Sequence, residues 1–386
     1  MKKLSVLIFV FVFYSAACSE TIISSEDIYL INGAQVFVLD ERYNGNLDLF
    51  FKEVKSKGIN TVFFRVFHNN KDRSHLNIPL NCESGVYFET KHACTVNNLL
   101  KDMVDYAHKN NIKLYAWMAT RSLSFLKTAD NMSMSLSAEG GDVSGYGANI
   151  FKKEVRDTLL NLFEDLAKYE IDGILFQDDF IIKYTEGSDK YAAALFKKET
   201  GIEVKKENFF KSIKEYNGRK VFSEYKDEFY VWAEWKSSQL ALLFKELKER
   251  AKTVNPKIKF AANVYYETPV DEAAALSWYS QKLSTLKSAG ADYFAVMGYF
   301  EQISSEQKLS RVETASLIGS IAENAVKVMG NEKAVIMKLQ SRSFLGKGML
   351  SYDDYKLVCR QVKLAGNISY AVVPVFSSDD IYVCPK

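Results

Sequence analysis

The sequence contains little that could bind a metal ion. Its four histidines, His68, His75, His92 and His108, do not show the spacing of a metalloenzyme. None of its five cysteines belongs to a CxxC pair. We therefore expect neither a metal site nor any other cofactor.

Motifs of nucleophilic hydrolases are also missing. There is no GxSxG elbow, and no Cys/His dyad can be argued from the sequence. Charged residues make up 25% of the chain, with a net charge of +2 and no block of like charge. We therefore expect no nucleic-acid partner.

Only one long apolar run is present, and it lies at the N-terminus. A basic start, the run "LSVLIFVFVFY" and the small residues before Cys18 predict a signal peptide over 1–17. The sequence "SAAC" resembles a bacterial lipobox, so we expect Cys18 to carry lipid and attach the chain to a membrane. The usual Leu three residues before that cysteine is missing, so ordinary secretion is the alternative. No later run of about 18 apolar residues could span a bilayer.

These features predict an exported protein, located in the outer membrane, in the periplasm or on the cell surface. Such compartments allow disulfides. The remaining cysteines form two local pairs, Cys82 with Cys94 and Cys359 with Cys384. Free thiols or crossed connectivities are the alternatives.

Short apolar runs alternate with amphipathic helical stretches through the rest of the chain, which is typical of βα units. The eight runs occupy 34–40, 61–67, 113–119, 173–179, 258–265, 293–299, 334–340 and 369–376. They predict a (β/α)8 barrel over 34–386, behind a lead-in at 18–33, and the eighth helix is missing. A doubly wound sheet is the alternative, but no glycine-rich phosphate loop follows the first strand. We expect a monomer.

Long insertions follow the second, third and fourth predicted strands, at 68–96, 120–150 and 180–223. All lie on the carboxyl side of their strands, where barrel enzymes build active sites. The segment 120–150 is rich in Ser, Gly and Met. It is either a mobile flap or a disordered loop.

The run "DGILFQDDF" (172–180) ends a buried strand in two carboxylates, Asp178 and Asp179. At the end of a barrel strand, such acids reach the mouth. Strand alternation places Phe176 and Asp178 on one side and Asp179 on the other, so only one acid can face the barrel interior. The alternative is that both acids cap the loop that follows.

Other strand ends add polar and aromatic groups that suit sugar binding. They are Arg65, His68, Trp117, Asn263, Tyr265, Tyr299, Glu301, Gln340 and Arg342. Glycoside hydrolysis needs a proton donor, a base or nucleophile, and aromatic surfaces for sugar faces. The predicted chemistry is therefore carboxylate acid/base catalysis on a polysaccharide.

Five motifs in this order resemble one protein family: "GVYFETKHA" (85–93), "LYAWMA" (114–119), "DGILFQDD" (172–179), "AANVYY" (261–266) and "FAVMGYFE" (294–301). The family is the glycoside-hydrolase-like C-terminal module of bacterial poly-β-1,6-N-acetylglucosamine N-deacetylases. The resemblance covers about 34–376. It implies a (β/α)8 barrel that binds, and in some members cleaves, partially deacetylated β-1,6-glucosamine polymers of the biofilm matrix.

Carried over by position, the resemblance implies roles for single residues. Asp178 would be the principal catalytic carboxylate, with Asp179 or Glu301 in the second role. The residues implied to bind substrate are Tyr87, His92, Trp117, Asn263, Tyr265, Trp278, Tyr299 and Gln340. Core packing on the fifth helix is the alternative for Trp278.

This chain also departs from the family pattern. Gln177 stands where His is frequent, and Phe344 stands near a usual Trp. The metal-dependent deacetylase domain is absent from this sequence. We expect an endo-acting hydrolase of a β-linked amino-sugar polymer. The alternatives are a surface lipoprotein that binds polysaccharide without cleaving it, and a hydrolase of a different exopolysaccharide.

Overall fold

The computed structural model describes residues 28–216, 218–346 and 348–385. The expected signal peptide and the expected lipidation of Cys18 lie outside these residues. No helix in the described part of the chain is long and apolar enough to cross a membrane.

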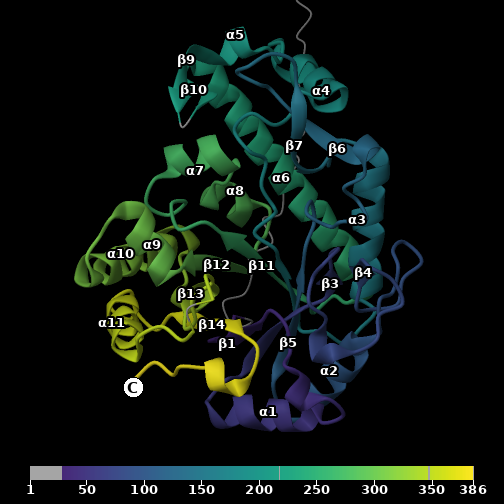
Figure 1. The fold of residues 1–386 in the computed structure, drawn as a ribbon, viewed down its shortest axis with the longest axis vertical. Helices are drawn as coiled ribbons and strands as arrows, with labels where there is room; N and C mark the ends of the chain where they lie inside the picture. Colours follow the sequence, from purple (N-terminus) through teal and green to yellow (C-terminus); the bar gives the residue numbers. More distant parts are fainter. Residues whose placement is uncertain (1–27, 217, 347, 386) are drawn as a thin grey trace, which may run out of the picture.

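Eight parallel strands form a closed barrel, which confirms the predicted fold class (Figure 1). In sequence order they are β1 (Asn32–Val36), β2 (Thr61–Arg65), β5 (Lys113–Met118), β8 (Gly173–Phe176), β11 (Lys259–Val264), β12 (Tyr293–Gly298), β13 (Val335–Gln340) and β14 (Ser369–Val375). Each strand pairs in parallel with its two neighbours, and β1 pairs with β14, with a register shift between Ala34 and Val36, to close the barrel.

Amphipathic helices cover the outside of the barrel, as Figure 1 shows. They are α1 (Leu47–Ser56), α2 (Leu99–Lys109), α3 (Lys153–Leu166), α6 (Asp227–Val254), α8 (Leu283–Ser288), α10 (Arg311–Met329) and α11 (Tyr352–Lys363). The helix α10 begins at a capping box between Ser310 and Glu313 and ends at Gly330, whose φ of 76° suits a residue without a side chain.

The described residues after β14 contain a single 3₁₀ turn at Ser378–Asp380 and no eighth α-helix. In its place, a disulfide joins Cys384 of the tail to Cys359 of α11. At the other end of the chain, Ile28 and Ile31 are buried in the core. The folded barrel therefore includes residues ahead of the expected boundary at 34.

The insertion after β2 contains β3 (Phe67–His68) and β4 (Gly85–Val86), and a disulfide joins Cys82 to Cys94 within it. The insertion after β5 forms a hairpin of β6 (Met132–Ser135) and β7 (Val143–Ala148). The prediction of a disordered loop over 120–150 is therefore wrong. Buried side chains such as Ser133, Ala148 and Ile150 hold this segment in place.

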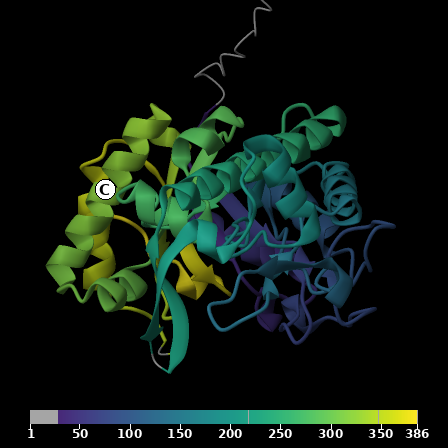
Figure 2. The same ribbon diagram turned by 90° about the horizontal axis from the view of Figure 1, so that it is seen from above.

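The insertion after β8 builds a small layer above the barrel, next to the first turns of α6 (Figure 1). It contains α4 (Lys190–Thr200), α5 (Lys206–Phe209), β9 (Phe210–Tyr216) and β10 (Arg219–Tyr225). Aromatic residues form its separate core, in which Phe209 stacks on Trp232 of α6 at 4.5 Å. Figure 2 shows the β9–β10 hairpin, in teal, extending away from the rest of the molecule.

Two short helices complete the mouth of the barrel. They are α7 (Glu272–Tyr279), which follows β11, and α9 (Phe300–Gln307), which follows β12. Both therefore lie on the carboxyl side of the strands, as the three insertions do.

Candidate active site

Alternate residues of each strand point into the barrel, and these inward-facing residues are the candidates for the site. At the base, Gly173 lies so close to the ring of Tyr115 that a Cβ would be 2.1 Å from it, so Gly173 and Tyr115 both face inward. Counting in steps of two along the paired strands places Trp117, Asn263, Lys338 and Gln340 on the same inner face. Tyr265 and Tyr299 directly follow β11 and β12 at the carboxyl ends.

Asp178 lies at the mouth and is half-buried. The hydroxyl of Tyr265 donates to the backbone oxygen of Asp178 at 3.4 Å. Burial raises the pKa of the Asp178 carboxyl, the charge of Lys338 lowers it, and the charge of Asp179 raises it. A carboxyl group with a raised pKa keeps its proton closer to neutral pH, which is what a general acid requires.

The strand β8 ends at Phe176, before the two acids. The ring of Phe176 packs outward, 5.1 Å from Phe163 of α3 and 4.5 Å from Phe244 of α6. The charge of Asp178 instead acts on Lys338, inside the barrel, and raises its pKa. The prediction that Phe176 and Asp178 share one side is therefore wrong, because alternation stops where the strand stops.

The carboxylate of Asp179 is hydrogen-bonded to the loop that follows β5. It accepts hydrogen bonds from the backbone N–H groups of Thr120, Arg121 and Ser122, at 2.6 to 2.9 Å. The hydroxyls of Thr120 and Ser122 donate to it as well. Asp179 is 1% exposed, so it holds the mouth together rather than reaching a substrate. The alternative that both acids cap the loop that follows them does not describe Asp179, because its donors belong to the loop after β5.

Glu301 lies in the first turn of α9 and is held by β13 and the segment that follows it. Its backbone N–H donates to Gln340 Oε1 at 2.9 Å, and its carboxylate accepts from Ser343 Oγ at 2.8 Å. The structure therefore brings Glu301 and Gln340 together at the end of β13.

Lys338 was not predicted, although it lies at the centre of the site. Its side chain is 2% exposed, its ammonium donates to Asn263 Oδ1 at 3.0 Å, and it lies 5.3 Å from the ring of Tyr299. Burial lowers the pKa of Lys338 to about 7, although the charge of Asp178 raises it. The alternation of "AVIMKLQ" would have identified it, because it shares the parity of Gln340.

Aromatic rings line the mouth beside these polar groups. Trp117 lies 4.7 Å from Phe37, and Phe344 lies 5.0 Å from Tyr299. Trp117 and Tyr299 are largely buried, so they form the wall of the site. Phe344 is 43% exposed and offers an accessible ring face there.

Trp278 of α7 is 49% exposed, which excludes the alternative that it packs in the core. Its ring lies 4.8 Å from that of Tyr184, in the insertion after β8. Next to it along the chain, Tyr279 stacks on Tyr265 at 4.0 Å, which links α7 to the interior of the mouth.

Two residues implied by the resemblance to bind substrate do not line the site. Tyr87 lies beside the carboxyl end of β2, but it is fully buried and its hydroxyl is hydrogen-bonded to Nδ1 of His68 at 2.9 Å. His92 lies near Asp165 in the last turn of α3, which is the end that leads to the base of β8. We therefore correct both assignments: Tyr87 has no exposed surface for a substrate, and the insertion after β2 carries His92 away from the mouth.

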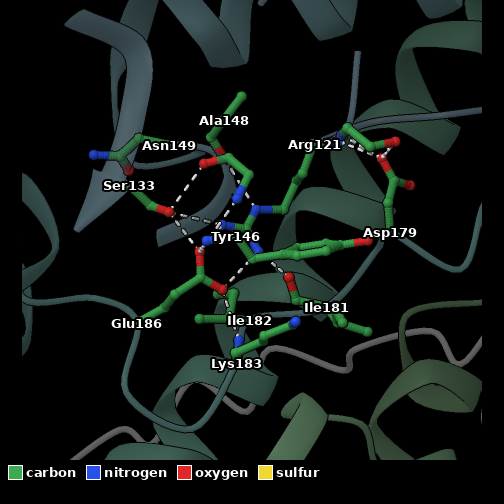
Figure 3. A network of polar contacts seen from close by, with 12 residues as sticks. Arg121, Ser133, Tyr146, Ala148, Asn149, Asp179, Ile181, Ile182, Lys183 and Glu186 are labelled. Carbon is green, nitrogen blue, oxygen red and sulfur yellow. Dashed lines mark hydrogen bonds and ion pairs between the residues drawn. The ribbon is translucent and has the colours of Figure 1, made fainter. Parts of the chain in front are cut away.

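Tyr146 of β7 was also not predicted. It is half-buried. Burial is the largest cause that raises the pKa of its hydroxyl, and the negative charges of Asp179 and Asp178 raise this pKa further. Figure 3 shows its ring reaching toward Asp179. No local pattern could have identified it, because the β6–β7 hairpin brings it to the mouth from 32 residues before Asp178.

A buried ion pair fixes this hairpin to the insertion after β8 (Figure 3). Arg121 and Glu186 lie 2.8 Å apart and are almost fully buried. Burial would raise the pKa of Glu186, but Arg121 and hydrogen bonds from Ser133 and Lys183 lower it to about 2. Arg121 also donates to the backbone oxygens of Ala148 and Ile181. Three segments of the mouth therefore share one polar centre.

Among the described residues, no group of three or more His, Cys, Asp or Glu side chains is arranged to hold a metal ion. The chemistry that the chain itself supplies is that of one half-buried carboxyl group beside a buried cation and several aromatic rings. This arrangement can donate a proton to a glycosidic oxygen while rings support the sugar.

Solved structures with a similar fold include three glycoside hydrolases. The PgaB (BpsB) glycoside hydrolase domain from Bordetella bronchiseptica matches with a TM-score of 0.70 and 18% identity, over 90% of this chain and 95% of that one. Alpha-L-fucosidase isoenzyme 2 from Paenibacillus thiaminolyticus matches with a TM-score of 0.56 and 11% identity, over 89% and 46%. The beta-galactosidase of Rahnella sp. R3 has a TM-score of 0.56 and 9% identity, over 92% and 53%.

Among proteins with curated descriptions, none matches this chain. The family comparison is more specific, since residues 38–372 match the family described as Hypothetical glycosyl hydrolase family 13. That match begins two residues after β1, runs into β14 and includes the acid pair and Lys338. The chain belongs to this glycosyl hydrolase family and is a glycoside hydrolase.

Proposed function

We propose that the chain is an exported, endo-acting glycoside hydrolase of a β-linked amino-sugar polymer. Partially deacetylated poly-β-1,6-N-acetylglucosamine is the first substrate to test. The observation that carries the proposal is the position of Asp178, a half-buried carboxyl group at the mouth of the barrel with a raised pKa. The fold of the chain resembles that of the PgaB glycoside hydrolase domain.

Asp178 acts as the general acid that protonates the glycosidic oxygen. The bond between the sugar C1 and that oxygen then breaks, and the leaving chain departs with the proton. Asp179 is bonded to five donors on the loop after β5, so it orients the mouth and does not attack the sugar. Glu301 is held by Ser343 and Gln340 instead.

An N-acetyl group on the substrate supplies the nucleophile in this scheme, as in substrate-assisted glycosidases. Its carbonyl oxygen attacks C1 from the face opposite the leaving group. Water then opens the cyclic intermediate, with the Asp178 carboxylate as general base. The hydroxyls of Tyr265 and Tyr299 lie near Asp178 and would orient the acetamido group.

Endo action is supported by aromatic surface beyond the mouth. Trp278 is half exposed, lies on α7 and contacts Tyr184 rather than Asp178. A ring there would stack on a sugar several units from the bond that is cut, which only a polymer could use.

The test is to incubate the 19–386 fragment with β-1,6-linked N-acetylglucosamine polymer, before and after partial deacetylation. Mass spectrometry of the products should show a ladder of oligosaccharides. Asp178→Asn should lower the rate by about 10²-fold or more. Release of monosaccharide alone would overturn the endo assignment, and no product from any amino-sugar polymer would overturn the substrate class.

A further inference from the structure

A second hollow lies next to the mouth, between the β6–β7 hairpin and β10. It has a volume of about 390 Å³ and is lined by β6 and β7, by the segment 183–185 and by residues 220–222 of β10. Leu136 N–H donates to the backbone oxygen of Thr185 at 2.9 Å, so the floor of this cleft is hydrogen-bonded backbone. Nothing in the proposed mechanism uses it.

The side chains that line the cleft suit a sugar. Tyr146 and Tyr184 supply aromatic surface, and the hydroxyls of Ser135, Ser137 and Ser144 supply donors and acceptors. Binding sites for small polar ligands combine rings with a few polar groups in this way.

The charges that line the cleft are both positive. Lys183 and Lys220 line it, and no carboxylate does. Lys183 Nζ lies 4.3 Å from the ring of Tyr146, and no ion pair joins Lys183 or Lys220 to a carboxylate among the described residues. Glu139 lies at the outer end, where its carboxylate accepts from the backbone N–H of Lys220 at 3.4 Å. The acids beneath Tyr146, Asp179 and Glu186, are already bonded to the loop after β5 and to Arg121.

Tyr146 lies between the cleft and the proposed catalytic mouth. Tyr146 lines the cleft, and the charges of Asp178 and Asp179 raise the pKa of its hydroxyl. Tyr184 lines it and contacts Trp278 at the rim. A polymer lying across Asp178 would therefore pass Tyr146 and enter the cleft.

We propose that this cleft is a subsite for a sugar unit that carries an acidic substituent, held by Lys183 and Lys220. The proposal rests on the proposed function and specifies its substrate: a glycan with negatively charged or acetylated units is preferred there over one with free amines. A carboxylate from a uronic acid and a carboxylate from an acyl substituent share the required chemistry. Charges at the edge of a site act mainly on selectivity and on salt dependence.

The test uses one oligosaccharide backbone in three charge states. The amines of a β-1,6-linked glucosamine oligosaccharide are left free, N-acetylated or N-succinylated, which gives positive, neutral and negative ligands. Affinities are measured by calorimetry with the Asp178→Asn variant, so that no ligand is cut. We expect the succinylated ligand to bind about tenfold more tightly than the free amine, and high salt to reduce this ratio.

The matched variants change two lysines at a time. Lys183→Met with Lys220→Met should bring the ratio of the two affinities close to one, and Lys183→Glu with Lys220→Glu should reverse the order. The control is Lys57→Met with Lys257→Met, which removes two exposed charges near the base of the barrel and should leave the ratio unchanged.

The outcome separates this inference from the proposed function. Equal affinities for the three ligands, or a preference for the free amine, would overturn the acidic subsite even if the wild type cleaves the polymer. A preference for the succinylated ligand that persists in the Lys183→Met, Lys220→Met variant would also overturn it. If the wild type cleaves none of the ligands, the binding ratios still decide the inference.

Discussion

The ammonium of Lys338 lies 3.0 Å from Oδ1 of Asn263, inside the barrel and two strands apart. The pair places a cation under the carboxyl group that the proposed mechanism needs. Because Lys338 is buried, its charge is weakly screened and acts on the ionisation of Asp178. The protonation of Asp178 should therefore depend on residue 338.

Lys338→Met should raise the pKa of Asp178, since the positive charge that favours its ionised form is lost. If Asp178 is the general acid, the alkaline limb of the kcat/KM profile should move to higher pH by about one unit. Lys338→Arg keeps its charge at every working pH and should not move the limb upward. Equal shifts in the two variants would show that packing, not charge, is responsible.

Asp179→Ala should destabilise the protein much more than Asp178→Ala does. The first change leaves the buried N–H groups of Thr120, Arg121 and Ser122 without an acceptor, which costs about 3 kcal/mol or more in total. The second removes a half-buried charge that has no comparable set of donors. Urea unfolding followed by circular dichroism measures both free energies of unfolding. Equal losses would contradict the different roles assigned to the two acids.

Removing one partner of the Arg121–Glu186 ion pair should strongly destabilise the protein. Glu186→Ala leaves the Arg121 cation buried without its partner and should lower the free energy of unfolding by about 3–5 kcal/mol. A double change, Arg121→Met with Glu186→Leu, should cost less than the sum of the single changes, because no lone charge remains.

The exposed pair of Lys101 and Asp105 is the control for that experiment. Asp105→Ala should cost far less than Glu186→Ala, because water already screens that pair. If Glu186→Ala costs no more than Asp105→Ala, the polar centre of Figure 3 does not stabilise the mouth.

Lys236 of α6 should make stability depend on pH above neutrality. It is fully buried, and burial lowers its pKa to about 7, although its ammonium donates to the backbone oxygens of Lys183 and Tyr184. Between this pKa and the value of about 10.4 for an unfolded lysine, the unfolded state binds more protons, so the free energy of unfolding rises with pH. This contribution is lost as the pH falls through 7.

Lys236→Met should remove the part of the rise in the free energy of unfolding that comes from Lys236. Burial also lowers the pKa of Lys338 to about 7, so the part that comes from Lys338 should remain. The measurement is the free energy of unfolding at several pH values from 6 to about 10, with the wild type and the variant compared at each. Parallel curves for the two proteins would show that Lys236 keeps its charge in the folded state.

The sequence was sufficient for the strands and for part of the site. Apolar runs marked all eight barrel strands, because parallel strands buried on both faces need continuous apolar residues. Trp117, Asn263, Tyr299 and Gln340 were identified because strand ends meet at one mouth. Lys338 shares the strand parity of Gln340 but lies two residues before the strand end, so a search of the strand ends alone did not find it.

The remaining features depend on tertiary contacts. The direction of Asp178 could not follow from alternation, since β8 ends two residues earlier. Tyr146 reaches the mouth on a hairpin held by Arg121 and Glu186, which are 65 positions apart. The location of His92 depends on the path of a long insertion, and no local pattern fixes that path.

The start of β1 sets which way the barrel faces. Tyr29 bonds through its backbone N–H to the hydroxyl of Tyr293, at the opposite end of the barrel from Asp178. The chain therefore enters the barrel from below. A tether joined at Ile28 would therefore attach to the end of the barrel opposite the proposed general acid.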